Sequence, residues 1–344
     1  MNWPSFQRTL LGLVLIAGIA FLLLLSDLNS RSASPRQTAN PDTSKPRRLT
    51  LIQIVEAPTI RSVREGMIAG LAESGLVEGR DYTLIVRDAQ GDISMLANLT
   101  DAAIVDHADM ILTITTPALQ TVMQRVRDRP VVFALALDPL LIGDTGTHEN
   151  HRANITGIFD RSPFEAVMQI VRECAPQAKV IGSLYNPAES NSVAFRDDLV
   201  ATAEKAGLRC ITLPVSSPAE VADAAAALCQ RGIDVFTQIN DNLHDASFPG
   251  IAQAARRARI PLFTFSSEHV RNGQAILAVA NDHHDAGREA GEIVARVLRG
   301  ENPANIPYRH SSRTRMTVNP DLAREYGVTL PVHVIARADE TIGQ

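Results

Sequence analysis

The most informative segment of the chain is Val180-Ile181-Gly182-Ser183-Leu184-Tyr185-Asn186-Pro187-Ala188-Glu189-Ser190-Asn191-Ser192. Its apolar first part is typical of a buried parallel strand, and residues 193–206 have the spacing of an amphipathic helix. Polar side chains and a helix start therefore lie just beyond the carboxyl end of a strand. Ligands of open α/β sheets bind at this position.

A second edge of the same kind lies upstream. The apolar residues 110–114 are followed by Thr115-Thr116-Pro117-Ala118, with proline placed as an early helical residue. Two such edges in two separate halves predict a ligand held between two lobes.

Strand-like runs alternate with helical patterns from residue 49 onward, at the spacing of βαβ units. The first series has predicted strands at 49–55, 82–87, 110–114 and 131–135, and helices at 60–74, 93–107 and 117–127. The second has strands at 179–184, 209–213, 235–238 and 262–265, and helices at 164–174, 193–206, 218–231 and 251–259.

Residues 154–158 are predicted as a hinge piece between the series, followed later by a strand at 275–280 and a helix at about 284–298. Residues 306–308 and 314–318 are predicted to form the last crossing. We expect an α/β protein of two Rossmann-like lobes with parallel sheets joined by a multi-strand hinge. Lobe 1 would hold 49–155 with about 282–305, and lobe 2 would hold 156–281 with about 306–335.

The first residues differ from the rest of the chain. Residues 10–25 are uninterrupted apolar sequence, and this run is slightly long for a signal peptide and slightly short for a membrane span. Residues 1–28 are interpreted as a transmembrane anchor or a cleaved signal, and residues 29–48 as a flexible linker. Basic residues follow the apolar run, and the positive-inside rule would place this part of the chain in the cytoplasm. The fold favours export, so we expect the periplasmic side of a bacterial inner membrane, with the membrane contacted through the N-terminal helix.

Composition excludes several classes of function. The formal net charge of −5, without a basic stripe, gives no reason to expect nucleic-acid binding. No Gly-x-Ser-x-Gly elbow, Walker loop or Gly-x-Gly-x-x-Gly follows a strand, so neither an enzyme nor a cofactor is predicted. The pairs His148/His151 and His283/His284 lack sharp metal-ligand spacing. The cysteines, Cys174, Cys210 and Cys229, are interpreted as three buried thiols, with a Cys210–Cys229 disulfide as the alternative.

Several short motifs occur in a fixed order along the chain. They are Ala89-Gln90-Gly91-Asp92, Thr116-Pro117-Ala118, Val131-Val132-Phe133 with Asp138-Pro139, Asn154-Ile155-Thr156-Gly157, Tyr185-Asn186-Pro187 with Glu189 and Asn191-Ser192, Asp241-Asn242, and Asn319 with Ala323 and Gly327. In this order and spacing, residues 50–331 resemble the ABC-transporter substrate-binding family that includes tryptophan- and tyrosine-uptake binding proteins.

The resemblance implies a type I periplasmic binding fold without catalysis. The ligand would be a small amino-acid-like or polar solute, and the partner an ABC permease. An alternative is a membrane-anchored sensing subunit that signals to a partner protein. Two segments depart from the family pattern. Glu56–Arg61 lacks the histidine and second acid of a Glu-His-Pro-Ala-Leu-Asp-like segment. An Asp-Tyr-like pair of the family appears here as Asp282-His283, followed by His284. Both are expected to face the cleft, which leaves the ligand's identity open.

The candidate ligand-binding residues lie at strand ends. Thr115 and Thr116 would seat a carboxylate at a helix N-terminus. Tyr185 would stack on the ligand and Glu189 would pair with an ammonium group. Each position also has an ordinary structural interpretation as a cap or a turn. The full set is Gln90, Thr115, Thr116, Asp138, Tyr185, Asn186, Glu189, Asn191, Asp241, Asn242 and Asp282.

Overall fold

The computed structural model describes residues 45–311 and 313–343. The predicted anchor or signal segment, and almost all of the predicted linker, lie outside these residues. Among the described helices, none combines the length and the apolar character needed to cross a membrane.

The first lobe is built on a six-stranded parallel sheet in the order β11-β5-β4-β3-β1-β2. The central strand at residues 110–114 is buried along its whole length, as its apolar run predicts. The strands are β1 (Arg47–Gln53), β2 (Tyr82–Asp88), β3 (Met110–Ile114), β4 (Val131–Ala136), β5 (Ile155–Phe159) and β11 (Arg309–His310). The helices are α2 (Pro58–Glu73), α3 (Met95–Val105), α4 (Thr116–Arg125) and α11 (His283–Leu298), with short 3₁₀ turns at Pro139–Leu141 and Pro303–Asn305.

The second lobe has a seven-stranded sheet in the order β13-β12-β10-β9-β8-β6-β7, in which only the β10–β12 pair is antiparallel. Its strands are β6 (Val180–Tyr185), β7 (Arg209–Pro214), β8 (Val235–Thr237), β9 (Leu262–Thr264), β10 (Leu277–Asn281), β12 (Thr314–Val318) and β13 (Glu340–Thr341). Its helices are α5 (Phe164–Cys174), α6 (Ser190–Lys205), α7 (Val221–Cys229), α8 (Asn242–Ala246), α9 (Phe248–Ala258), α10 (Ser267–Arg271), α12 (Pro320–Glu325) and α13 (Val332–Arg337), with a 3₁₀ turn at Pro218–Glu220.

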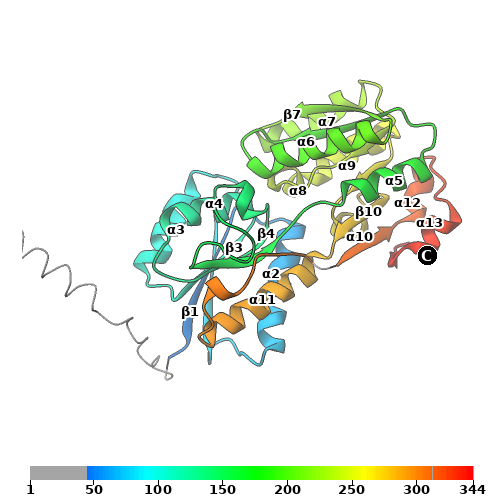
Figure 1. The fold of residues 1–344 in the computed structure, drawn as a ribbon. Coiled ribbons are helices and arrows are strands. Elements are labelled where there is room, and N and C mark those ends of the chain that lie inside the picture. Colours follow the sequence, from blue (N-terminus) through cyan, green and yellow to red (C-terminus); the bar gives the residue numbers. More distant parts are fainter. Residues whose placement is uncertain (1–44, 312, 344) are drawn as a thin grey trace, which may run out of the picture. The chain divides into compact units, whose positions relative to one another are not determined.

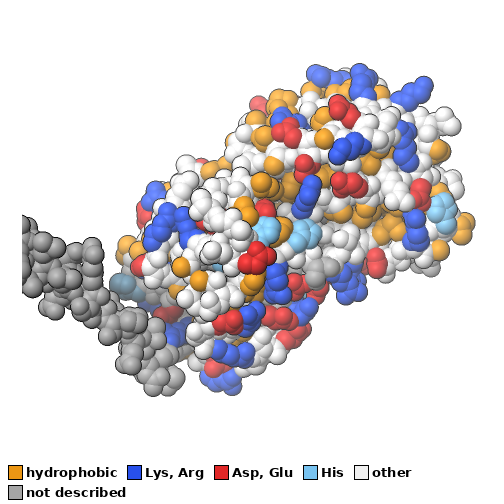
Figure 2. Space-filling view, viewed as in Figure 1, with side chains coloured by type: hydrophobic (Ala, Val, Ile, Leu, Met, Phe, Trp, Pro, Cys, Tyr) orange, Lys and Arg blue, Asp and Glu red, His pale blue; other side chains and the backbone are white. Residues whose placement is uncertain are grey.

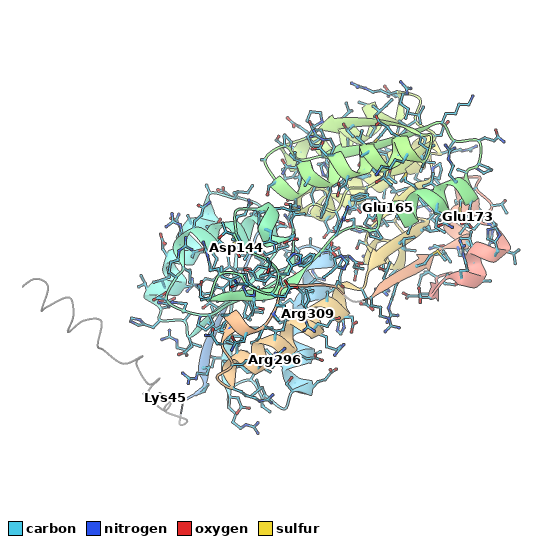
Figure 3. The ribbon with its side chains drawn as sticks, viewed as in Figure 1. Lys45, Asp144, Glu165, Glu173, Arg296 and Arg309 are labelled. Atoms are coloured by element: carbon cyan, nitrogen blue, oxygen red, sulfur yellow. The ribbon has the colours of Figure 1, made fainter. Side chains whose placement is uncertain are left out.

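Each lobe has its own hydrophobic core. The described chain passes between the lobes after β5, after β10 and after β11 (Figure 1). In Figure 3 the labelled Asp144 and Arg296 belong to the first lobe, and Glu165 and Glu173 to the second. The predicted fold, two α/β lobes with parallel sheets, is confirmed.

Helices α2 and α11 pack unusually closely because glycines line their contact. A Cβ atom on Gly70 would lie 2.1 Å from the Arg288 carbonyl oxygen, and one on Gly287 would lie 2.1 Å from the Val63 carbonyl oxygen. This contact fixes α11, which follows the second crossing, onto the first lobe.

The structure differs from the predicted elements mainly at their ends and at the hinge. Residues 155–159 and 309–310 are strands of the first sheet. The chain therefore passes from the first lobe to the second a few residues later than predicted at both places. The short helices α8, α10, α12 and α13 were not predicted, since five or six residues show too little periodicity. All three cysteines are free thiols, and the alternative Cys210–Cys229 disulfide is not formed.

On the face shown in Figure 2, cationic and anionic side chains are interspersed. That face therefore carries no large patch of a single charge of the kind that attracts nucleic acid.

Candidate functional site

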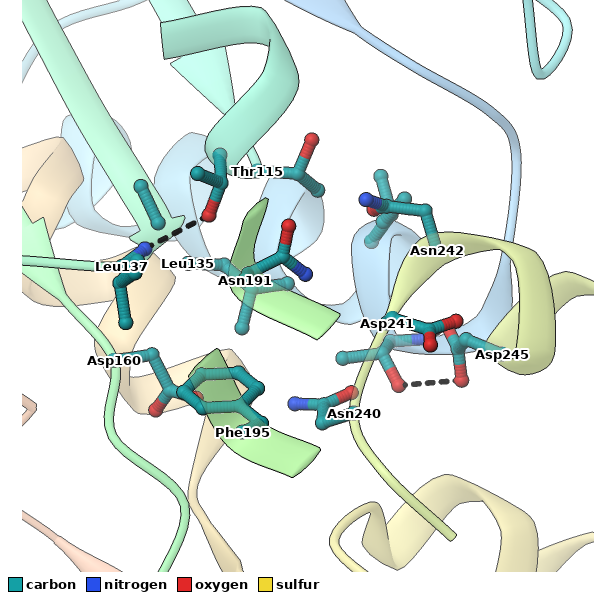
Figure 4. A pocket seen from close by; sticks show the side chains of 14 residues that line it. Thr115, Leu135, Leu137, Asp160, Asn191, Phe195, Asn240, Asp241, Asn242 and Asp245 are labelled. Carbon is teal, nitrogen blue, oxygen red and sulfur yellow. Dashed lines mark hydrogen bonds between the residues drawn. The ribbon is translucent and has the colours of Figure 1, made fainter. Parts of the chain in front are cut away.

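A pocket lies between the two lobes. Fourteen residues line it, from both lobes and from the first crossing (Figure 4). They are Thr59, Ile60, Thr115, Thr116, Leu135, Ala136, Leu137, Asp160, Asn191, Phe195, Asn240, Asp241, Asn242 and Asp245.

The first-lobe wall is made by the ends of β3 and β4 and by the start of α4. Thr115 has φ 83° and Leu135 has φ 51°, in a region that side chains other than glycine rarely adopt. Backbone in such conformations costs of order 1–3 kcal/mol per residue and tends to occur at functional sites. Thr116 Oγ1 accepts a hydrogen bond from the Leu137 backbone N–H at 2.9 Å, which joins the two strand ends.

Two buried polar atoms on residues that line the pocket have no hydrogen-bond partner among the described residues. They are Thr115 Oγ1 in the first lobe and Asn191 Oδ1 in the second. A buried polar atom left unpaired costs about 1–3 kcal/mol. The pair therefore indicates a site that a polar ligand completes from both sides.

Buried acid–histidine pairs support the second-lobe wall. Asp241 caps α8 by accepting from the His244 N–H at 2.8 Å, and its Oδ2 lies 2.7 Å from His244 Nδ1. Asp241 also accepts from the Ser192 hydroxyl at 2.5 Å. Asp245 Oδ1 lies 2.6 Å from His269 Nε2. These contacts hold both carboxylates in place at the pocket.

The pocket has three carboxylates, Asp160, Asp241 and Asp245, and no Lys, Arg or His among its lining residues. Its apolar part comes from Ile60, Leu135, Ala136, Leu137 and Phe195, all buried or half-buried. The arrangement suits a ligand with a cationic group and an apolar part.

Hydrogen bonds of Thr59 and of Ser190 join the lobes directly. Thr59 Oγ1, at the start of α2, donates to Asp245 Oδ1 at 3.0 Å and lies 2.8 Å from Ser266 Oγ. Ser190 Oγ, at the start of α6, donates to Gln120 Oε1 on α4 at 2.9 Å. We call the contact of Thr59 with Asp245 and Ser266 the latch.

Five of the eleven sequence-predicted residues line the pocket: Thr115, Thr116, Asn191, Asp241 and Asn242. In Figure 4, Asn191 lies in view between Thr115 and Leu137 on one side and Asp241 and Asn242 on the other. Their contact with a ligand stays a prediction.

Glu189 and Asn186 lie behind the pocket wall. Glu189 Oε1 accepts from Asn186 Nδ2 at 2.9 Å and from the Leu243 N–H at 3.2 Å, and Oε2 accepts from the Asn242 N–H at 3.1 Å. Burial and the nearby charge of Asp241 raise the pKa of Glu189 above its ordinary value. Its carboxyl group thus joins the β6–α6 loop to α8, instead of lining the pocket.

The other four predicted residues do not line the pocket. The guanidinium carbon of Arg196 lies over the Tyr185 ring, 4.6 Å from the ring centre. Asp282 caps α11 and lies 2.5 Å from Arg315 Nε. Asp138 is 2.7 Å from His148 Nε2 and caps the 3₁₀ turn that follows it. Gln90 is exposed on the loop after β2, the edge strand of the first sheet.

The two segments that depart from the family pattern contribute unequally to the site. Thr59 and Ile60 line the pocket, whereas Ala57 lies in the first-lobe core. His283 does not line the pocket. Its Nδ1 lies 3.4 Å from Glu268 Oε2. Burial alone would lower the pKa of His283, but the hydrogen bond and charge of Glu268 raise it.

Sequence reasoning missed nine lining residues. Asp160 and Asn240 follow strands β5 and β8 closely, so the strand-end rule used for Asp241 could have found them. Phe195 and Asp245 lie inside helices, and no local signal distinguishes them from core and surface positions. The others are Thr59, Ile60, Leu135, Ala136 and Leu137. Among the described residues, no group of three or more His, Cys, Asp or Glu is placed to hold a metal ion.

Comparison with known proteins shows where this architecture recurs. The sequence profile described as "ABC transporter substrate binding protein" matches residues 48–342. The tyrosine-binding protein of Clostridioides difficile is 27% identical over 310 residues, which cover 90% of this chain and 89% of that protein.

Two solved structures are informative. A domain from Streptococcus pneumoniae in complex with L-Trp has a TM-score of 0.81 at 27% identity, over 87% of this chain and all of that one. A ligand-free, open substrate-binding protein from Clostridium difficile has a TM-score of 0.64 at 26% identity, over 86% of this chain and 98% of that one. At nearly equal identity, the TM-score with the L-Trp complex is higher than that with the open protein.

Proposed function

This chain belongs to the ABC transporter substrate-binding protein family, whose members bind solutes rather than transform them, and we propose that its ligand is a free amino acid with an aromatic or large apolar side chain. The observation that carries the proposal is the pair of unpaired buried atoms, Thr115 Oγ1 and Asn191 Oδ1, on residues lining opposite sides of one pocket.

The carboxylate of the ligand would bind at the start of α4. The first N–H groups of a helix have no intrahelical acceptor, and the helix dipole favours an anion there. Thr115 Oγ1 supplies a hydroxyl donor beside them. Because no cationic side chain lines the pocket, a carboxylate there depends on neutral donors such as these.

The ammonium group would bind between Asp160 and Asn191. Asn191 Oδ1 is an acceptor without a partner among the described residues, and Asp160 is a carboxylate that no cationic lining residue neutralises. The side chain of the ligand would lie against Phe195, Leu135 and Leu137. An aromatic ring packs well on such a wall because aromatic pairs add about 0.5–1.5 kcal/mol beyond the area they bury.

The relatives support the same ligand class, since one is named for tyrosine and another holds L-Trp. Membership of this family also implies that the protein binds its ligand outside the cytoplasm. We propose that the chain acts on the periplasmic side of a bacterial inner membrane, exported through or anchored by its N-terminal apolar segment. Its ligand would pass to the permease of an ABC importer.

Isothermal titration calorimetry with L-tryptophan, L-tyrosine, L-phenylalanine and L-leucine tests the proposal. Thr115→Val keeps the shape of the side chain and removes its hydroxyl, so we expect affinity to fall by about 10-fold or more, the value of one hydrogen bond to a charged group. Thr121→Val on the same helix is the matched control, because Thr121 Oγ1 bonds only to the Pro117 carbonyl oxygen. No binding of any of these amino acids, or unchanged affinity in Thr115→Val, would contradict the proposal.

A further inference from the structure

Asn281 is a buried amide that does not line the pocket but touches a residue that does. It ends β10, just before the second crossing, and is 3% exposed. Its Nδ2 donates to Asp160 Oδ1 at 2.6 Å and to the Arg161 carbonyl oxygen at 3.0 Å. Its Oδ1 accepts from the Thr314 hydroxyl at 3.1 Å.

Asn281 and its three partners together belong to the three different passages between the lobes. Asp160 and Arg161 follow β5, Asn281 itself precedes α11, and Thr314 begins β12 after β11. One side chain therefore links every crossing of the described chain. The amide orientation is determined by chemistry, because a carbonyl oxygen can only accept and so must face Nδ2.

The contact with Asp160 has a consequence for the pocket. Asp160 is 6% exposed and lines the pocket, and its backbone N–H donates to the Ala136 carbonyl oxygen at 2.7 Å. With its backbone held by β4 and Oδ1 held by Asn281, Asp160 is restricted to one orientation. Oδ2 is the carboxylate oxygen that Asn281 does not bind.

We infer that Asn281 is a positioning residue, which orients the Asp160 carboxylate toward the ligand's ammonium group and couples that contact to the three crossings. The inference rests on the proposed function, since it assigns the ammonium group of an amino acid to Asp160. Asn281 itself does not touch the ligand. Its effect on binding depends entirely on the presence of a carboxylate at 160 and of an ammonium group on the ligand.

The test compares two probes on the full-length chain: L-tryptophan, and indole-3-propionate, which lacks the ammonium group. Asn281→Leu should weaken L-tryptophan binding at least 10-fold and change indole-3-propionate binding less than 2-fold. In the Asp160→Asn background, adding Asn281→Leu should cost no further L-tryptophan affinity. Asn319→Leu is the matched control, because Asn319 is a buried amide of the same lobe that caps α12.

A second design remains informative if Asn281→Leu folds poorly. The exchange Asp160→Asn with Asn281→Asp restores an amide–carboxylate hydrogen bond but moves the carboxylate away from the pocket. We expect it to recover thermal stability relative to Asn281→Asp alone and not to recover L-tryptophan affinity.

Three results would overturn the inference. Equal losses for the two probes, additive losses in the double variant, or recovered affinity in the exchange would each show that Asn281 acts only as a structural amide. Absence of binding of L-tryptophan, L-tyrosine, L-phenylalanine and L-leucine to the unsubstituted chain would instead refute the proposed function, and this inference with it.

Discussion

Replacing Thr59 by valine removes the latch hydroxyl while keeping the shape of the side chain. Thr59 is 1% exposed and stands at the start of α2 in the first lobe, whereas its partners Asp245 and Ser266 belong to the second. The hydroxyl bonds exist only when the lobes are together. Their loss should therefore weaken the closed arrangement specifically.

The size of the effect follows from what remains after the substitution. Asp245 keeps the backbone N–H of Thr59 at 3.3 Å and the ring of His269 at 2.6 Å, so its carboxylate is not left without partners. The loss is then mainly the hydrogen bond to the charged Asp245, about 2 kcal/mol, because Ser266 Oγ still donates to Glu268 Oε2. At 1.4 kcal/mol per factor of ten, this corresponds to roughly 30-fold weaker apparent binding. A ligand that must first close the lobes bears this difference in full.

Calorimetric titration with L-tryptophan measures the change. Thr100→Val is the matched control, because Thr100 is equally buried and its hydroxyl bonds to the Leu96 carbonyl oxygen within α3. Thr59→Ser restores a hydroxyl and should recover most of the affinity. If Thr59→Val binds as tightly as the unsubstituted chain, the latch does not hold the lobes together and the reasoning fails.

Three further predictions concern the protein around the pocket. The pKa of His283 is raised and the pKa of Glu268 is lowered, so their pairing stabilises the fold when both groups are charged. This stabilisation is complete between pH 4.5 and pH 6.5, the ordinary pKa values of the two groups, and it is lost as the pH rises through the raised pKa of His283. The unfolding free energy of His283→Gln should thus differ most from the unsubstituted chain near pH 5–6, and an equal difference at pH 9 would contradict this. Gly70→Ala should lower the free energy of unfolding in urea by about 1–3 kcal/mol or more, because its Cβ would meet a backbone oxygen of α11; an unchanged midpoint would contradict the packing. Burial raises the pKa of Cys210 to about 12, so its labelling by iodoacetamide at pH 8 should be slow until urea unfolds the chain.

Hydrophobic periodicity was sufficient to predict the two lobes and most long elements. Buried parallel strands such as β3 and β4 are continuous apolar runs, and the helices between them are long enough to show their period. The boundaries between the lobes were harder to predict from the sequence. Residues 155–159 look like an isolated piece in sequence, and their place in the first sheet depends on pairing with β4. Pairing between distant strands leaves no local signal.

The candidate site was predictable where the backbone alone places a side chain. Thr115, Thr116, Asp241 and Asn242 follow strands, and strand ends of parallel sheets meet at one edge. Glu189 follows a strand as well, yet its carboxyl group turns back toward the N–H groups at the start of α8. The direction of a side chain depends on such partners from elsewhere in the chain, which the strand-end rule does not contain.

The unpaired atoms and the latch have opposite effects on closing without a ligand. Bringing the lobes together leaves Thr115 Oγ1 and Asn191 Oδ1 buried and unpaired, at about 1–3 kcal/mol each. The hydroxyl bond of the latch returns about 2 kcal/mol. Together the two unpaired atoms cost about 2–6 kcal/mol, which equals or exceeds the contribution of the latch, so the empty protein gains little or nothing by closing. A ligand that pairs both atoms removes the unfavourable term and leaves the favourable one. If the charged ends of an amino acid bind as proposed, one on each lobe, closing around the ligand requires both of them.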